Sequence, residues 1–179
     1  TTDDAAGEAF DKAARVLNIP YPGGPLLDKL AEEGNPEAYR FPKIHTEGKY
    51  DFSFSGLKTA VINQAHMLRQ KGEEIRVADW SASLRKAVVD MLVDKTLAAC
   101  RDTGAKSVAL AGGVASNRLL RREMERRGTK MGLKVYMPPV ALCTDNAVMI
   151  GSAAFYRLMT DEPAPLSLNA QPSIRLIEE

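Results

Sequence analysis

The segment spanning residues 107–139 restricts the fold of this chain more than any other, because it has the pattern of a strand, a helix and a second strand. Residues 107–111 are predicted to form a buried strand, followed by Gly112-Gly113. A helix is expected from about residue 116 to residue 127, closed by Gly128, and a second strand over residues 134–137. A crossover this short favours a right-handed parallel unit, so the fold class is predicted to be α/β.

Helices are expected on the N-terminal side of this unit. Apolar residues at helical spacing predict a helix over residues 4–17, and a stretch rich in proline and glycine ends it. Pro25 suits the first turn of a second, short helix that ends near Gly34. Two longer helices are predicted, one from Ser55, which could cap it, to about residue 70, and one over residues 77–101, which Gly104 stops.

The other segments are a strand pair, a last helix and a tail. Ile44, Tyr50, Phe52 and Phe54 predict a short β-hairpin around residues 47–48. A helix is expected from about residue 146 to residue 159. We therefore predict a mainly helical segment with the hairpin (1–104), an α/β core (105–160) and a poorly periodic C-terminal tail (161–179).

Composition narrows the class of protein. The chain has 179 residues with 45% hydrophobic and 26% charged side chains, which is typical of a soluble globular chain and excludes a disordered or collagen-like one. No apolar run of about 18 residues is present, so no membrane span is expected. Cys100 and Cys143 form no Cys-x-x-Cys pair and suit a reducing cytosol. Because the chain starts without Met and enters a helical pattern at once, it is expected to be the C-terminal part of a longer protein.

A first candidate site lies where the two predicted strands end. Ligands bind at the carboxyl ends of parallel strands, so Gly112, Gly113, Asn117 and Asp145 could converge there. Paired glycines let backbone amides approach a phosphate, the Asn117 amide could bind a base, ribose or phosphate, and Asp145 could ligate a metal ion. Alternatively, the glycines form only a turn, and residues 144–146 only cap a helix.

A second candidate site combines Asp11, Gly24 and Asp28. Gly24 stands just before a predicted helix start, where an anion or sugar could be contacted, and the two carboxylates lie near it in sequence. The alternative is a tight turn between two helices with solvated acids.

Histidines and a basic run offer weaker signals. His45 and His66 are far apart and form no His-x-x-x-His pattern, which indicates surface or partly packed residues. A basic run over residues 118–134 could meet RNA phosphates or could be a solvated helix face, and no aromatic residues interleave with it.

Five ordered motifs carry a resemblance to a known family. They are Asp-Asp-Ala-Ala-Gly-Glu-Ala-Phe-Asp-Lys (3–12), Tyr-Pro-Gly-Gly-Pro (21–25), Phe-Ser-Phe-Ser-Gly-Leu-Lys-Thr-Ala (52–60), Ala-Gly-Gly-Val-Ala-Ser-Asn (111–117) and Cys-Thr-Asp-Asn (143–146). Together they resemble the TsaD family of tRNA adenosine threonylcarbamoyltransferases, formerly called O-sialoglycoprotein endopeptidases, in its bacterial form. The motifs span nearly the whole chain.

The resemblance implies a fold and a reaction. The fold is that of the actin-like ATPases (the sugar kinase, heat-shock protein and actin superfamily), of which this chain would be the C-terminal lobe with a helical insertion, the N-terminal lobe being absent. The reaction transfers the threonylcarbamoyl group from threonylcarbamoyl-AMP to the exocyclic amine of the adenosine beside the anticodon of tRNA. The expected partners are tRNA and proteins of the TsaB and TsaE families, the expected compartment is the cytoplasm, and no membrane is involved.

The resemblance also assigns residues. Asp11, Gly24, Asp28 and Asn117 match substrate or nucleotide contacts, with ATP, AMP or threonylcarbamoyl-AMP as ligand. Gly112 and Gly113 would line the phosphate region. Asp145 matches a ligand of one divalent metal ion, iron or zinc, shared with two histidines of a His-x-x-x-His motif that this chain does not contain.

This departure leaves alternatives open. No general base is evident, so the catalytic residues are unknown, and the isolated chain is expected to be inactive. A metal-dependent glycoprotease, the older family assignment, would need about three protein ligands, of which one matches here. A non-catalytic lobe that serves partner assembly is the other alternative.

Overall fold

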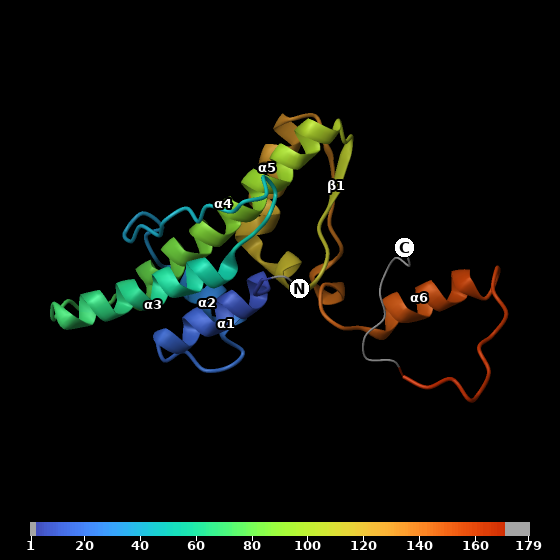
Figure 1. Ribbon diagram of the computed structural model, residues 1–179, viewed down its shortest axis with the longest axis horizontal. Helices are drawn as coiled ribbons and strands as arrows, with labels where there is room; N and C mark the ends of the chain where they lie inside the picture. The colour runs from blue at the N-terminus through green and yellow to red at the C-terminus, as the bar shows by residue number, and fades with distance from the viewer. Residues whose placement is uncertain (1–2, 171–179) are drawn as a thin grey trace. The chain divides into compact units, whose positions relative to one another are not determined.

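The computed structural model describes residues 3–170, and the chain divides into two compact units, Thr1–Thr144 and Asp145–Glu179 (Figure 1). The second unit contains α6 (Ala147–Arg157). The first unit contains the other elements: α1 (Ala6–Val16), α2 (Gly23–Leu30), α3 (Phe54–Gln70), α4 (Val77–Thr103), β1 (Ser107–Ala109), the 3-10 turn η1 (Gly113–Ser116), α5 (Arg118–Lys130), β2 (Lys134–Tyr136) and the 3-10 turn η2 (Val140–Leu142). The predicted helices and the predicted α/β class are confirmed.

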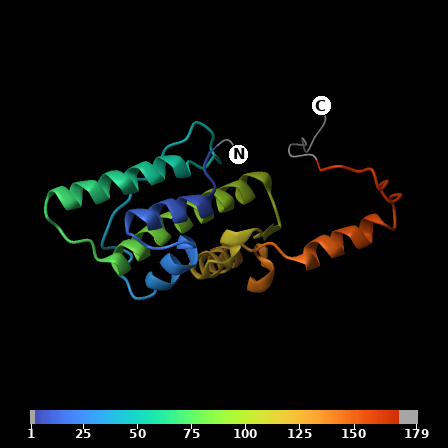
Figure 2. The same ribbon diagram turned by 90° about the horizontal axis from the view of Figure 1, so that it is seen from below.

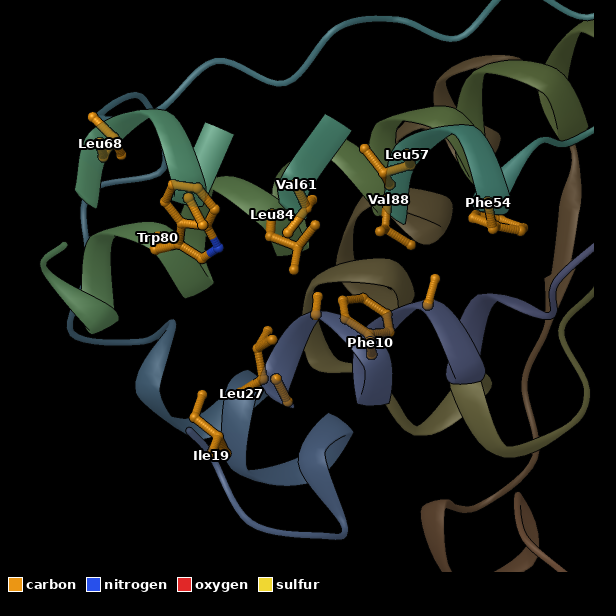
Figure 3. Packing of buried hydrophobic residues seen from close by; sticks show 14 residues of the cluster. Phe10, Ile19, Leu27, Phe54, Leu57, Val61, Leu68, Trp80, Leu84 and Val88 are labelled. Carbon is orange, nitrogen blue, oxygen red and sulfur yellow. The ribbon is translucent and has the colours of Figure 1, made fainter. Parts of the chain in front are cut away.

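The first four helices enclose one hydrophobic core. Helix α1 contacts α2 and α3, while α2 contacts α4, and Figure 2 shows this layering from below. Phe10 of α1, Leu57 of α3 and Trp80 of α4 point into the shared interior (Figure 3), where the exposed fractions of Leu57 and Trp80 are 1% and 0%. Burial of such large apolar side chains is the main force that holds the four helices together.

A second core lies beside the C-terminal half of α4. Val93 and Leu97 of α4 pack with Leu120 and Met124 of α5. Helix α4 therefore serves both cores along its 27 residues, and Gly104 ends it in the left-handed conformation (φ 67°), as predicted.

The two strands pair in parallel, as predicted, with Val108 opposite Val135. The prediction that the first strand is buried was wrong, because Ser107 and Ala109 are exposed and Val108 is only half-buried. Within the described residues the sheet has only these two strands. Helix α5 packs against β2, and Ser107 and Ala109 of β1 stay exposed to solvent.

The predicted hairpin over residues 41–54 was also wrong, because this segment contains no strand. The coil that begins just before this segment and continues through it contacts α4 instead: the Tyr39 amide donates to Ser83 Oγ (3.1 Å), and Lys95 Nζ donates to Thr46 Oγ1 (2.7 Å). Phe41 packs edge-on against Trp80, with ring centroids 5.2 Å apart. The alternating apolar residues therefore anchor a coil to the helical core.

Two predicted helix boundaries need correction. Ser53, not Ser55, caps α3, since its Oγ accepts from the Gly56 amide, while Ser55 binds Asp3. Gly128 lies inside α5, which continues to Lys130, instead of closing it. A glycine suits this position because a Cβ would come within 2.8 Å of Val135 Cγ2.

In the second unit, Asn146 caps α6 by accepting a hydrogen bond from the Met149 amide (2.9 Å). No residue of α6 is buried. Of the described part of the chain, no helix has the length and apolar character needed to cross a membrane. The predicted tail is described only up to residue 170.

Candidate nucleotide-binding site

Helix α2 carries two of the predicted site residues one turn apart. Gly24 and Asp28 are four residues apart and so share one face of the helix. The Gly24 amide donates a hydrogen bond to Asp11 Oδ1 of α1 (3.0 Å). This amide, predicted as a direct contact for an anion or sugar, is therefore occupied by a carboxylate of the chain itself.

The close approach of α1 and α2 depends on Gly23. A Cβ at this position would lie 2.5 Å from the Cβ of Ala14 and 3.3 Å from the Cα of Asp11, so a larger residue does not fit. At Gly24 the nearest atom to such a Cβ is 3.8 Å away, which is ordinary contact. The glycine pair thus has two roles, with Gly23 providing close packing and Gly24 providing the amide that Asp11 binds.

Asp28 and Asn117 lie 89 positions apart in sequence and form a direct hydrogen bond. Asn117 Nδ2 donates to Asp28 Oδ1 (2.8 Å), and Asn117 Oδ1 accepts from the Leu120 amide (2.9 Å). Asn117 is buried, with 8% of its surface exposed. It caps α5 and binds the Asp28 carboxylate at the same time, and its contact with a ligand stays a prediction.

Arg85 of α4 completes the group and was missed by the sequence analysis. Its Nη1 donates to Asp28 Oδ1 (3.0 Å) and to the Asp28 carbonyl (3.1 Å), and its Nη2 donates to the Ala31 carbonyl (3.1 Å). Nη1 also binds Glu32 and thereby lowers the pKa of that carboxyl. The one signal in the sequence was position, since Arg85 stands next to Leu84 and four residues before Val89 on the core-facing side of α4.

Gly112 and Gly113 come into the neighbourhood of this group through α1. A Cβ at Gly7 would lie 3.5 Å from Val114 Cγ2, so the η1 turn, which begins at Gly113, contacts α1 one helical turn before Asp11. Gly112 has φ 81°, a conformation that favours glycine, and both glycines are exposed with open space beside them. Their backbone groups are accessible.

A second cluster joins the first and third motifs. Asp3 accepts hydrogen bonds from the Ser55 amide (2.9 Å) and hydroxyl (2.8 Å), and these bonds lower its pKa to about 2. Asp4 pairs with Lys12 (2.9 Å) and Lys58 (3.1 Å), which lower the pKa of its carboxyl. The sequence analysis assigned these residues no contact, although their motifs were part of the resemblance.

Asp145 belongs to the second unit, so its predicted convergence with Gly112, Gly113 and Asn117 stays a prediction. Within residues 3–170, His, Cys, Asp and Glu form no group of three or more that could hold a metal ion. The chain's own described residues therefore do not make up a metal centre.

The arrangement defines an α/β protein in which two carboxylates and one buried amide gather around one short helix, with a glycine turn in contact with the neighbouring helix α1. The family profile described as TsaD, tRNA N6-adenosine threonylcarbamoyltransferase, matches residues 1–152, and the chain belongs to this family.

Curated relatives bear the name tRNA N6-adenosine threonylcarbamoyltransferase. One from Moorella thermoacetica is 58% identical over 177 residues, which is 98% of this chain and 52% of the relative. One from Clostridium perfringens is 52% identical over 179 residues, and one from Clostridium botulinum is 50% identical, each covering 99% of this chain and 53% of the relative. The chain thus spans about half the length of the curated relatives it matches.

Proposed function

We propose that this chain supplies the adenylate-binding part of a tRNA N6-adenosine threonylcarbamoyltransferase. The complete enzyme is this chain together with the other half of a full-length family member. The observation that carries the proposal is the hydrogen-bonded gathering of Asp11, Gly24, Asp28 and Asn117 around α2. The family match supports the same assignment.

The proposed ligand is threonylcarbamoyl-AMP or the corresponding nucleotide. Within the described residues, Asp11 and Asp28 each use one carboxylate oxygen in the bonds above, which leaves the other oxygen for the hydroxyl groups of a ribose. The second N–H of the Asn117 amide remains a donor. Backbone amides at Gly112 and Gly113 would contact the phosphate.

The proposed reaction uses this binding to orient the donor. The adenine amine of tRNA attacks the carbamoyl carbon of the mixed anhydride, and AMP leaves. Rigid positioning of the adenylate by Asp11, Asp28 and Asn117 brings the reacting atoms together, which lowers the entropic part of the barrier. Backbone amides at Gly112 and Gly113 would stabilise the charge that develops on the leaving phosphate.

Asp145 is proposed as one ligand of a divalent metal ion, iron or zinc, in the complete enzyme. Its remaining ligands, histidines by the family resemblance, would come from outside this chain. Metal content of the complete enzyme, measured with and without the Asp145→Ala substitution, tests this assignment. Equal metal content in the two proteins would contradict it.

TsaB and TsaE family proteins are proposed as partners, and the cytoplasm as the compartment. The isolated chain is expected to have no transferase activity, because the proposed metal ligands and the other half of the family length are not in it. Threonylcarbamoyladenosine formed on tRNA by the chain alone would overturn this expectation.

Calorimetric titration of AMP into the complete enzyme tests the binding site. Asp28→Asn and Asn117→Ser are each expected to weaken AMP binding at least ten-fold. Serine retains the helix cap of α5 but loses the bond to Asp28, so it separates the site role of Asn117 from its structural role. Unchanged AMP affinity in both variants would contradict the proposed site.

Product analysis tests the reaction. The complete enzyme is given threonylcarbamoyl-AMP and tRNA, and the nucleosides are analysed by mass spectrometry. In parallel it is given a glycoprotein, because the older family assignment was a protease. Cleavage of the glycoprotein without tRNA modification would contradict the proposed transferase function and favour a protease.

A further inference from the structure

A cavity of about 590 Å³ lies between the C-terminal halves of α4 and α5, apart from the proposed nucleotide site. Its polar lining consists of four basic side chains and one carboxylate: Arg101, Arg126, Arg127, Lys130 and Asp94. The four basic residues are called the basic groove below. The whole chain has a net charge of only +1, so this concentration of positive charge is local.

Two of the four cations are already compensated within the chain. Arg127 pairs with Asp94 (2.5 Å), and Arg126 pairs with Glu123 (2.6 Å). Arg101 and Lys130 are exposed and form no ion pair with a carboxylate in the described part of the chain. The groove therefore presents two uncompensated cations beside two arginines that are paired with carboxylates.

The neighbouring cavity extends this surface. It has a volume of about 620 Å³, shares Asp94 with the basic groove, and lies between α4 and the coil of residues 36–49. Lys43, Lys86 and Lys95 are among its lining residues. Lys86 pairs with Asp90 (2.6 Å) and Lys43 with Asp94 (3.9 Å), so carboxylates of α4 already compensate two of these three lysines.

The position of the groove relative to the nucleotide site fits an extended polyanion. Asn117 caps the N-terminal end of α5, and Lys130 is the last residue of the same helix. Thirteen residues of α-helix span about 20 Å. At about 3.4 Å per phosphate, this distance corresponds to roughly six nucleotides of a duplex strand.

The chemistry favours backbone contact over base reading. The groove has no aromatic side chain on which a base could stack, and its apolar lining residues are Leu97 and Met131. Arginine and lysine bind phosphate oxygens without regard to sequence. A partner that places one base near Asn117 and carries phosphates about 20 Å away is a nucleic acid, and the proposed function makes it an RNA.

We propose that the basic groove binds the phosphate backbone of the RNA substrate while the target adenosine reaches the donor bound at the nucleotide site. The proposal rests on the proposed function for the identity of the RNA. Arg101 and Lys130 supply the contacts, and the ion pairs of Arg126 and Arg127 hold the walls of the groove.

The test is the double substitution Arg101→Glu and Lys130→Glu in the complete enzyme. Binding of an unmodified tRNA transcript is measured by fluorescence anisotropy at several salt concentrations. We expect at least a ten-fold loss of affinity at about 0.1 M salt. The slope of log K against log salt should become less steep by about 1.5, since each lost phosphate contact removes about 0.7–0.9.

The matched control reverses two exposed cations elsewhere, Arg15→Glu and Lys71→Glu. Lys71 precedes the N-terminus of α4, whose 27 residues span about 40 Å, while Arg101 lies near its other end. This control should change tRNA affinity less than two-fold. Both double variants should bind AMP and unfold in urea like the parent protein.

Equal losses in the two double variants would overturn the proposal, since the effect would then come from net charge alone. Unchanged tRNA affinity in the groove variant, in an enzyme that still modifies tRNA, would overturn the groove and leave the proposed function standing. If the groove variant lost binding to an acidic protein but kept its tRNA affinity, RNA would not be the occupant of the groove. A complete enzyme that binds tRNA through the groove but does not modify it would instead refute the proposed function.

Discussion

The region around α2 and the helix α6 differ in how far other elements of their own unit cover their side chains. At α2, the Asp28 carboxylate accepts hydrogen bonds from Arg85 of α4 and from Asn117, which caps α5. Leu27 beside it is fully buried. In α6, Ile150, Phe155 and Tyr156 remain 58–67% exposed although the helix is as apolar as a core helix. An apolar sequence therefore predicts a helix in both places, but the helix becomes part of a core only where other elements of its own unit pack against it.

The comparison is tested most strongly by removing one phenylalanine from each region. Phe10→Ala is expected to lower the free energy of unfolding by about 3–5 kcal/mol, because it leaves a cavity in the main core. Phe155→Ala should change it by less than about 0.5 kcal/mol. Urea unfolding followed by circular dichroism measures both values in this chain. Similar losses at the two positions would show that α6 is packed as tightly as α1.

Removal of the buried cation tests whether the polar group at α2 is a structural unit. Arg85→Met retains much of the side-chain volume but leaves Asp28 with one partner fewer in a partly buried place. We expect a loss of about 3 kcal/mol in the free energy of unfolding. Lys71→Met, at an exposed position, is the control and should cost below about 0.5 kcal/mol. An Arg85 variant as stable as the control would contradict the role assigned to this network.

A smaller effect should separate the two glycines at the start of α2. Gly23→Ala places a methyl group against Ala14 and should cost about 1–3 kcal/mol through overpacking. Gly24→Ala meets nothing closer than 3.8 Å and should be close to neutral for stability. The same urea titration measures both, and equal costs would show that the close approach of α1 and α2 does not depend on Gly23.

Much of the fold could be predicted from the sequence because its helices have strong local signals. The stripe of Trp80, Leu84 and Val88 and the stop at Gly104 define α4, and the parallel pair followed from the short crossover. The coil at residues 41–53 could not be predicted this way, because its pattern matches a hairpin while Thr46 and the Asp51 carbonyl accept hydrogen bonds from Lys95, far away in sequence.

The candidate site was predictable in its members but not in its contacts. Asp11 and Gly24 are thirteen residues apart, and Asp28 and Asn117 are eighty-nine apart, so no local pattern shows that they form pairs. Arg85 belongs to no sequence motif. Its acceptors are the Asp28 carboxylate and the carbonyls of Asp28 and Ala31, and only the packing of α2 against α4 brings them within its reach.

The smallest expected effect concerns the acid stability of the first motif. Hydrogen bonds from Ser55 lower the pKa of Asp3 to about 2, below the unfolded value of about 3.9. A depressed pKa means that the unfolded chain takes up the proton first as pH falls, so the stabilisation is complete above about pH 4 and is lost between about pH 4 and pH 2. The melting temperature of the parent chain should therefore fall more steeply over this interval than that of Asp3→Asn, which has no charge to lose. Since the carboxylate is near the surface, the difference should amount to a small shift. Parallel curves for the two proteins over this interval would show that the bonds from Ser55 to Asp3 contribute no stability.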